Sequence, residues 1–377
     1  MAKGHRRPAW LEVDCKALED NARVLSEVIA PSQLCAVVKA DGYGHGAVES
    51  AKAFVRGGAS WLAVAIAEEG IELRRAGISE PILLLSEPFS GGMEEAVVHD
   101  LVPTIYSHEG LNSLVSATNK LGESRKKTQV HVKVDTGMHR VGATSKEAAD
   151  LITTIIQLDS VELSGLWTHF ANADDLNDDY SLEQLSVFDS LLETLPSEIV
   201  EALSIHTCNS AAGVRYPMAR RSMVRCGISL YGYLPFAPGS FPDLQLTSAL
   251  SLKARVSFVK TLPKGSRLSY GLDYETQEDT VVATVPVGYA DGIPRRFGRC
   301  GGEVIIRGKK VPVVGNVTMD QLLVDCGPDS QVMVGDEVVL LGNQSDQSIT
   351  ANDWASWLSV IVYEVICGFT GRLPRLI

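Results

Sequence analysis

The sequence predicts an α/β protein with an N-terminal (β/α)8 TIM barrel and a C-terminal, mainly β domain. Apolar runs alternate with amphipathic stretches eight times over about 230 residues, as expected for eight strand–helix pairs closing into a barrel. The composition changes after residue 239, where the chain becomes rich in valine and in short runs broken by turns. We therefore place the barrel at residues 1–240 and the β domain at residues 241–377.

Length and charge narrow the class of protein further. A chain of 377 residues is long for one domain and suits two. The hydrophobic content of 45% against 21% charged residues indicates a globular protein with a large core. The net charge of −12 argues against a nucleic-acid partner or an anionic membrane surface, because both need a basic patch.

The sequence also predicts a cytoplasmic location. The longest apolar runs, Trp61–Ala67 and Trp357–Tyr363, fall far short of the roughly 18 residues that a membrane span needs. The first ten residues carry three basic side chains, but no apolar segment follows, so we expect no signal peptide. Seven cysteines without a Cys-x-x-Cys pair predict scattered buried thiols in a reducing compartment, with neither disulfides nor a metal site.

The expected barrel strands are short apolar runs, and amphipathic helices lie between most of them. In chain order the strands are Leu34–Lys39, Trp61–Ala67, Pro81–Ser86, Leu101–Tyr106, Val130–Asp135, Val161–His169, Ala202–Asn209 and Met223–Tyr231. Helical patterns include Lys16–Ile29, Glu68–Ala76, Lys146–Leu158 and Leu182–Leu195. A doubly wound open sheet is the alternative, but no Gly-x-Gly-x-x-Gly turn follows the first strand, so we favour the barrel.

The β domain is expected over residues 244–341, where turn signals such as Lys264-Gly265 and Arg307-Gly308 separate valine-rich runs. One helix should follow. Thr350 is its expected N-cap and Asp353 stands at the third helical position, the spacing of a capping box.

Catalytic residues of a (β/α)8 barrel stand at the carboxyl ends of its strands. The first strand ends at Lys39 and leads into a glycine-rich segment, residues 40–46. A lysine in this low-dielectric mouth can be neutral and nucleophilic enough to form a Schiff base. A snorkelling or ion-paired lysine is the alternative reading of the motif.

Polar residues recur at the other strand ends. The loops after the seventh and eighth strands form the usual phosphate site of this fold, and here they carry Ser210, Gly227 and Ile228. A nucleophilic lysine and a phosphate cradle in one barrel mouth suggest pyridoxal phosphate. Taken singly, residues such as His169 and Asn209 could equally be hydrogen-bonded polar groups of the core.

The motifs together are more specific, since they occur in one order from residue 7 to the C-terminus. They are AVVKADGYGHGA, VKVDTGMHRVG, THFANAD, HTCNSAA, RCGISLYG, LSYGLDY, VGYADG, GNVTMDQ and YEVICGFTGRLPR. In these motifs the chain resembles the bacterial alanine racemases, which are pyridoxal-phosphate enzymes of fold type III. The resemblance implies a head-to-tail homodimer in which each active site is shared between the subunits.

The resemblance also implies roles for particular residues. Lys39 would carry the cofactor, and Tyr270 from the partner would be the second acid/base. Arg140 and the backbone of Met319 would receive the substrate carboxylate, Tyr289 would stand at the entrance, and Lys133 would be carbamylated. The remaining cofactor contacts would be Tyr43, His169, Asn209, Ser210, Arg225, Gly227, Ile228 and Tyr363.

The implied reaction is the interconversion of L-alanine and D-alanine by two bases, supplying D-alanine for cell-wall peptidoglycan. A serine or broad-spectrum racemase of the same fold is the nearest alternative. A related decarboxylase would not need the tyrosine, and a non-enzymatic cofactor carrier would not need the β domain. Two positions depart from the family pattern: His139 stands where glycine is common, and Cys226 where proline is common.

Overall fold

The computed structural model describes residues 7–121, 126–237 and 239–377. The first six residues, part of the segment analysed for a signal peptide, and Pro238, beside the expected composition change, lie outside the described residues. The chain forms two compact units. The barrel unit is Cys15–Ser248, and the β unit comprises residues 7–14 together with Ala249–Ile377.

Eight parallel strands form the closed ring of the barrel unit, which confirms the predicted fold. Two four-stranded sheets, ordered β4-β3-β2-β9 and β5-β6-β7-β8, make up the ring. A parallel bridge between Leu83 and Val102 joins them at one side, and the Ser222 N–H donates to the Ile205 carbonyl at the other, at 2.9 Å. The strands are β2 (Gln33–Val37), β3 (Ala59–Val64), β4 (Ile82–Leu84), β5 (Thr104–Ile105), β6 (Thr128–Lys133), β7 (Val161–Trp167), β8 (Ser204–His206) and β9 (Met223–Cys226).

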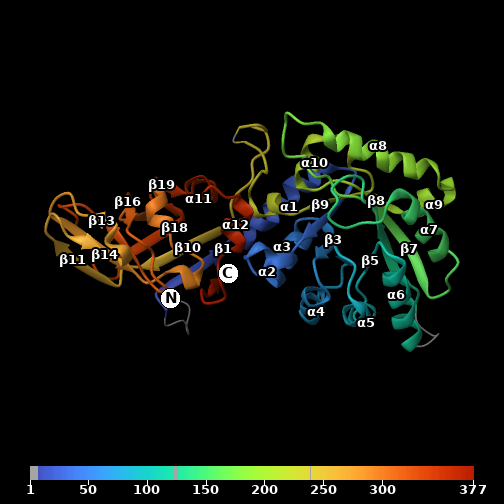
Figure 1. Ribbon diagram of the computed structural model, residues 1–377, viewed down its shortest axis with the longest axis horizontal. Helices are drawn as coiled ribbons and strands as arrows, with labels where there is room; N and C mark the ends of the chain where they lie inside the picture. Colours follow the sequence, from blue (N-terminus) through green and yellow to red (C-terminus); the bar gives the residue numbers. More distant parts are fainter. Residues whose placement is uncertain (1–6, 122–125, 238) are drawn as a thin grey trace. The chain divides into compact units, whose positions relative to one another are not determined.

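Helices alternate with these strands along the chain, and in Figure 1 they run in order from blue α1 through teal α6 to green α8. The longer helices bury one apolar face: α1, for example, buries Leu18, Leu25 and Ile29 at helical spacing. The helices are α1 (Cys15–Ile29), α2 (Lys39–Tyr43), α3 (Ala47–Arg56), α4 (Ala67–Arg75), α5 (Ser90–Val98), α6 (His108–Lys120), α7 (Ser145–Ile155), α8 (Tyr180–Glu193), α9 (Ser197–Ala202) and α10 (Ser210–Arg215).

The β unit is built on a ten-stranded sheet. Its order is β11-β14-β17-β16-β15-β18-β10-β1-β20, with β19 paired to β18. The strands are β1 (Ala9–Val13), β10 (Leu250–Arg255), β11 (Phe258–Leu262), β14 (Thr280–Val285), β15 (Glu303–Ile306), β16 (Lys309–Val314), β17 (Leu322–Asp325), β18 (Glu337–Gln344), β19 (Gln347–Ile349) and β20 (Arg375–Leu376). A separate ribbon pairs β12 (Arg267–Leu268) with β13 (Tyr274–Glu275).

The N-terminal strand β1 belongs to this unit and pairs antiparallel with β10, placing Leu11 opposite Leu252. The expected boundary at residue 240 assigns these N-terminal residues to the barrel. Their pattern accounts for the difference: Ala9, Leu11 and Val13 are buried while the residues between them are partly exposed. Such alternation is typical of an antiparallel strand with one face on a core, whereas barrel strands such as β4 are buried throughout.

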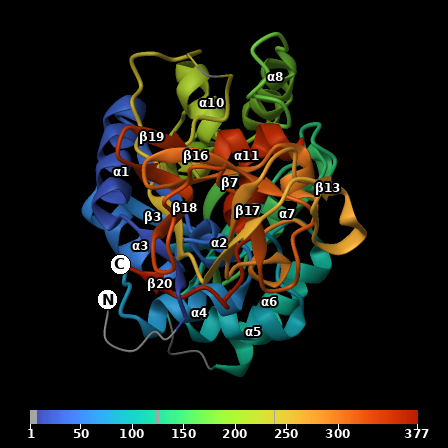
Figure 2. The same ribbon diagram turned by 90° about the vertical axis from the view of Figure 1, so that its left-hand side faces the viewer.

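The predicted helix α11 (Ala351–Leu358) is present with its capping box. The Asp353 N–H donates to the Thr350 hydroxyl at 3.1 Å, and the Thr350 N–H donates to the Asp353 carboxylate at 2.7 Å. Trp354 anchors the helix to β18, since its indole N–H donates to the Leu340 carbonyl at 2.9 Å; α11 is drawn red in Figure 2. A second helix, α12 (Val362–Cys367), follows.

The cysteines fit the expectation of buried thiols only in part. All seven are free, but just Cys35, Cys208 and Cys226 are buried, and Cys367 is exposed. Burial raises the pKa of the Cys208 thiol to about 11, so it stays protonated at neutral pH. Within the described residues, no helix combines the length and the apolar character required to cross a bilayer.

Candidate active site

Lys39 stands at the carboxyl end of β2, where it opens the short helix α2 and is half-buried. The residues that follow it have left-handed backbone, with φ of 53° at Ala40, 53° at Asp41, 59° at Gly42 and 50° at Tyr43. Such a conformation costs an L-residue roughly 1–2 kcal/mol, so the surrounding structure must hold this turn.

Glu69 on α4 supplies part of that support. One carboxylate oxygen accepts the Ala40 N–H at 2.6 Å, and the other accepts the Ala65 N–H at 2.7 Å. Asp41 closes the turn from within, because its carboxylate accepts the Ala47 N–H at 3.0 Å. Glu69 therefore ties the backbone beside Lys39 to the end of β3. Glu69 could not be identified from the sequence, since nothing in its spacing distinguishes it from a surface glutamate.

Arg225 on β9 is buried, and its two terminal nitrogens make five hydrogen bonds. Nη1 donates to His206 Nδ1 at 2.6 Å and to the His206 carbonyl at 3.1 Å. Nη2 donates to the carbonyls of Thr168 at 2.8 Å and Thr207 at 3.1 Å, and to His169 Nδ1 at 3.3 Å. Burial lowers the pKa of Arg225 to about 10, which leaves it charged at neutral pH.

The third nitrogen of Arg225, Nε, has no hydrogen-bond partner within the described residues. With both Nη atoms committed, Nε–H is a fixed donor that remains for a ligand. An arginine does not give up its proton, so an acceptor such as a ring nitrogen would receive a hydrogen bond there without being protonated.

Two buried histidines, His206 and His131, extend the hydrogen-bond network of Arg225. His206 accepts from Arg225 at Nδ1, so its proton lies on Nε2, which donates to His131 Nδ1 at 2.9 Å. Burial, reinforced by the charge of Arg225, holds the pKa of His206 well below its usual value and lowers that of His131 to about 3. Both rings are therefore neutral. The sequence analysis gave neither residue a role, because a histidine inside an apolar run carries little signal.

His169 lies after β7 and presents Nδ1 to Arg225, so its proton is on Nε2. Burial is the main reason that its pKa lies well below the usual value, and the charges of Arg225, Arg140, Lys133 and Lys39 lower it further. These four cations act on one imidazole because they surround the same mouth of the barrel. That concentration of positive charge favours an anionic ligand.

The expected phosphate site is assembled at the next two strand ends. Ser210 Oγ accepts the Gly227 N–H at 2.8 Å, and Asn209 caps α10 by accepting the Ala212 N–H at 3.0 Å. A Cβ atom on Gly227 would lie 2.5 Å from the Tyr43 hydroxyl, so only glycine allows this approach. Ile228 follows as the first residue of a 3-10 turn, Ile228–Tyr231. The structure thus brings together Tyr43, Ser210, Gly227 and Ile228.

Lys133 is the last residue of β6 and is only 3% exposed. Its ammonium lies 4.4 Å from the centre of the Trp167 ring. Burial, with the charges of Arg140 and Arg225 added, lowers the pKa of Lys133 to about 7. A much larger fraction of this lysine is therefore neutral at pH 7 than of an ordinary surface lysine.

The loop after Lys133 is held by Asp135. Its carboxylate accepts the N–H groups of Gly137 and His139, both at 3.0 Å, and contacts the His139 ring at 3.2 Å. His139 has φ of 56°, so the position does require left-handed backbone, and these contacts offset the strain of the missing glycine. Arg140 follows and is exposed.

The other expected site residues lie in the β unit. Tyr270 opens the turn η3 (Tyr270–Leu272), and its side chain is 70% exposed. Tyr289 and Met319 are also exposed, whereas Tyr363 on α12 is half-buried.

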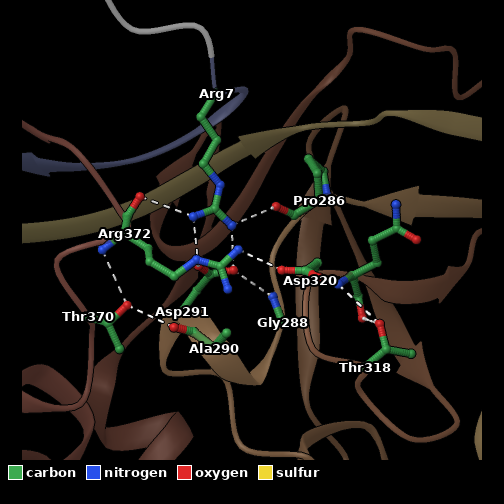
Figure 3. Close-up of polar contacts among 10 residues, drawn as sticks. Arg7, Pro286, Gly288, Ala290, Asp291, Thr318, Asp320, Thr370 and Arg372 are labelled. Atoms are coloured by element: carbon green, nitrogen blue, oxygen red, sulfur yellow. Dashed lines mark hydrogen bonds and ion pairs between the residues drawn. The ribbon is translucent and has the colours of Figure 1, made fainter.

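The buried carboxylate of Asp291 lies two residues after Tyr289, and Figure 3 shows its contacts with Arg7 and Arg372. Arg7 binds both oxygens of Asp291, at 2.7 Å and 2.5 Å, and Arg372 reaches the same group at 3.4 Å. Arg372 also pairs with Asp320 at 2.6 Å. Between the segments that carry Tyr289 and Met319, the Tyr289 N–H donates to the Thr318 carbonyl at 3.0 Å and the Ala290 N–H donates to the Met319 carbonyl at 3.1 Å. The two segments therefore form one platform.

The fold and this geometry define a class: a (β/α)8-barrel enzyme with an additional β domain, whose mouth offers a half-buried lysine and an anion site. Matches to family models identify the chain more specifically. The model described as alanine racemase, N-terminal domain, matches residues 13–235, and the C-terminal domain model matches residues 249–377.

Similar proteins agree over the full length. The chain is 43% identical to an alanine racemase of Symbiobacterium thermophilum over 369 residues, covering 98% of this chain and 97% of the relative. A crystal structure of alanine racemase from E. faecalis matches with a TM-score of 0.92 at 35% identity, over 100% of this chain and 99% of that one. The Bacillus anthracis alanine racemase with bound L-Ala-P matches with a TM-score of 0.90 at 36% identity, over 99% and 95%.

The chain belongs to the alanine racemase family. It is an isomerase that racemises alanine, which confirms the resemblance, the fold and the reaction expected from the sequence.

Proposed function

We propose that the barrel mouth binds pyridoxal 5'-phosphate and that Lys39 and Tyr270 are the two bases that exchange the Cα proton of alanine. Arg225 is the observation that carries the proposal. Five hydrogen bonds fix its guanidinium, Nε–H has no partner within the described residues, and three further cations act with Arg225 on the neighbouring His169. A donor held so rigidly suits an aromatic ligand with one ring nitrogen and one anionic group.

The cofactor's pyridine nitrogen would accept from Arg225 Nε, and its phosphate would lie against Ser210, Gly227, Ile228 and Tyr43. Tyr363, Asn209 and His169 complete the proposed contacts. When bound, pyridoxal phosphate withdraws electrons from the substrate and so makes its Cα–H acidic. Because Arg225 keeps its proton, it limits that electron withdrawal, which would disfavour side reactions such as transamination.

Lys39 would hold the cofactor and move a proton on one face of the substrate. The strained turn behind it, tied down by Glu69, fixes where its amine can reach. We propose that the barrel unit (Cys15–Ser248) supplies most of the cofactor contacts and that the β unit supplies the second base.

Tyr270 would act from the other subunit of a head-to-tail homodimer. Its side chain is 70% exposed in one chain, and Leu272, Tyr289 and Met319 are exposed large side chains of the same unit. Exposed apolar side chains of this kind support an interface. In the dimer, the partner subunit's Tyr270 would face Lys39 across the substrate, and the partner subunit's Tyr289 would narrow the entrance.

Arg140 and the backbone of the partner subunit's Met319 would bind the substrate carboxylate. We propose that Lys133 is carbamylated, because only a neutral amine reacts with carbon dioxide and the pKa of Lys133 is about 7. A carbamate would place a negative charge among the cations of Arg140 and Arg225 and would orient Arg140.

The bound L-Ala-P of the Bacillus anthracis racemase supports an amino-acid substrate of the size of alanine. The serine or broad-spectrum alternative is not favoured by the names of the relatives, although one hydroxyl is discriminated only weakly by a small pocket. Supply of D-alanine for peptidoglycan in the cytoplasm is the role that we propose for this reaction.

Reduction with borohydride followed by peptide mapping tests the assignment of Lys39. The protein loaded with pyridoxal phosphate should carry the reduced cofactor on the peptide containing Lys39. A label on Lys133, or on no lysine, would overturn the proposed site. Rates on a panel of D-amino acids, with alanine fastest, would test the substrate.

A further inference from the structure

We infer that Asn316 is a positioning residue that aims Tyr270 through the backbone of its loop. The inference rests on the catalytic role proposed above for Tyr270. With 70% of that side chain exposed, packing within one chain does little to direct it. The direction of the phenol is therefore set by the conformation of residues 269–273.

That loop needs to be held, because much of it is left-handed. Ser269 has φ of 62°, Gly271 of 83° and Leu272 of 53°. Serine and leucine disfavour this region, and the backbone bond that closes the turn, from the Leu272 N–H to the Ser269 carbonyl, is long at 3.2 Å. Without an external anchor, the loop would relax to other conformations and carry Tyr270 with it.

Asn316 provides the anchor from the segment between β16 and β17, and it is only 3% exposed. Its Nδ2 donates to the Tyr270 carbonyl at 2.6 Å and to the Asp273 carboxylate at 3.0 Å. The backbone carbonyl of Asn316 accepts a hydrogen bond from the Ser269 hydroxyl at 2.5 Å. One residue thus binds the loop before Tyr270, at Tyr270 and after it.

The chemistry of the contacts suits an amide. Both loop acceptors, a carbonyl and a carboxylate, need N–H donors, and a single NH2 group supplies the two. The Asn316 Oδ1 atom is buried without a partner in the described part of the chain, which is unfavourable. The two hydrogen bonds donated by Nδ2 therefore explain why asparagine occupies this position although its Oδ1 atom is unpaired.

A close approach of the two segments makes these contacts possible. Gly315, the neighbour of Asn316, has φ of 69°, and a Cβ atom there would lie 2.9 Å from the Ser269 Cβ. The loop is also tethered at its far end, where Arg299 lies 3.5 Å from the Asp273 carboxylate. Because a base displaced by about 1 Å can cost 100-fold in rate, loss of the Asn316 contacts should lower kcat by roughly 10- to 100-fold.

A double-variant experiment separates positioning from stability. Asn316→Asp removes both donors and places a carboxylate against Asp273, so Tm and kcat should both fall. Adding Asp273→Asn supplies an amide that donates to the new carboxylate at position 316. This restores the contact between positions 316 and 273, but the Tyr270 carbonyl still lacks its donor. In the double variant we expect Tm to recover, with kcat still lowered at least about 10-fold and KM little changed.

The control and a second measurement complete the test. Asp273→Asn alone keeps an acceptor for Asn316 and should retain nearly wild-type kcat. In protein labelled with 3-fluorotyrosine, the 19F resonance that Tyr270→Phe abolishes should shift or broaden in the double variant. This measurement does not depend on the reaction, and it still applies if Asn316→Asp alone fails to fold.

Recovery of kcat together with Tm in the double variant would overturn the inference, as would an unchanged 19F resonance. If Tyr270→Phe itself kept wild-type kcat, the proposed role of Tyr270 would fail, a different result from failure of Asn316 alone.

Discussion

The buried Lys133 should make the stability of the protein depend on pH. Its pKa falls from 10.5 to about 7 because burial removes water from the ammonium and the nearby charges of Arg140 and Arg225 disfavour it further. The unfolded chain holds this proton up to about pH 10.5 and the folded chain loses it near pH 7, so the unfolded state binds more protons between those values. Stability should therefore rise with pH across the window from pH 7 to pH 10.

The magnitude follows from the shift. At about 1.4 kcal/mol per pKa unit, burying this lysine costs on the order of 5 kcal/mol at pH 7. Lys133→Met keeps a long apolar chain beside the Trp167 ring and removes the amine. In buffer free of carbon dioxide, the variant should be more stable than the wild type at pH 7, and the difference should shrink toward pH 10.

Thermal unfolding of both proteins at several pH values provides the assay. Lys310→Met, which removes an exposed lysine of β16, is the matched control and should follow the wild-type pH profile. Parallel profiles for Lys133→Met and the wild type would refute the argument from burial.

The same neutral amine should react with carbon dioxide. At pH 7 the neutral fraction of Lys133 is about 1000-fold larger than that of an ordinary lysine. Protein equilibrated with 13C-bicarbonate should therefore show a carbamate resonance that is lost in Lys133→Met. No resonance, or one that persists in the variant, would contradict the proposed carbamylation.

Three further predictions concern other parts of the molecule. Arg7→Ala leaves the buried Asp291 with only the longer ion pair to Arg372 among the described residues, so the free energy of unfolding should fall by about 3 kcal/mol in a denaturant titration. A loss below about 1 kcal/mol would refute the role of the Arg7–Asp291 pair. Thr350→Ala should destabilise by about 1 kcal/mol while Thr350→Ser does not, because only the hydroxyl caps α11. Arg225→Glu should change the absorption spectrum of the loaded enzyme with alanine and slow racemisation; an unchanged spectrum and rate would contradict its contact with the ring nitrogen.

Barrel strands could be predicted because most are short and largely apolar, and strands such as β2 and β4 are buried on both faces. Lys39, Ser210 and Gly227 followed from one rule, that barrel catalysis occurs at strand ends, and the motif resemblance added Tyr270 and Arg225. The sequence did not predict strand β1, and the expected boundary at residue 240 leaves its residues with the barrel. Its antiparallel partner β10 lies about 240 residues away, and no local signal marks such a pairing.

The supporting residues escaped sequence reasoning for a physical reason. Glu69, Asn316 and His131 act on backbone groups or on other polar side chains across long separations in sequence. Their spacing to the residue that they support is arbitrary, since it depends on tertiary contact. His139 is the converse case: it stands where glycine is common in the family, and the structure has left-handed backbone there.

Mixing two inactive variants tests the shared active site most directly. Lys39→Ala and Tyr270→Phe each remove one base, so each homodimer should be close to inactive. Co-refolding equal amounts gives half heterodimers, in which one site of two combines the intact Lys39 of one chain with the intact Tyr270 of the other. Activity should return to about a quarter of wild type. If Tyr270 acts within its own chain, every site lacks one base, and mixing should recover no activity.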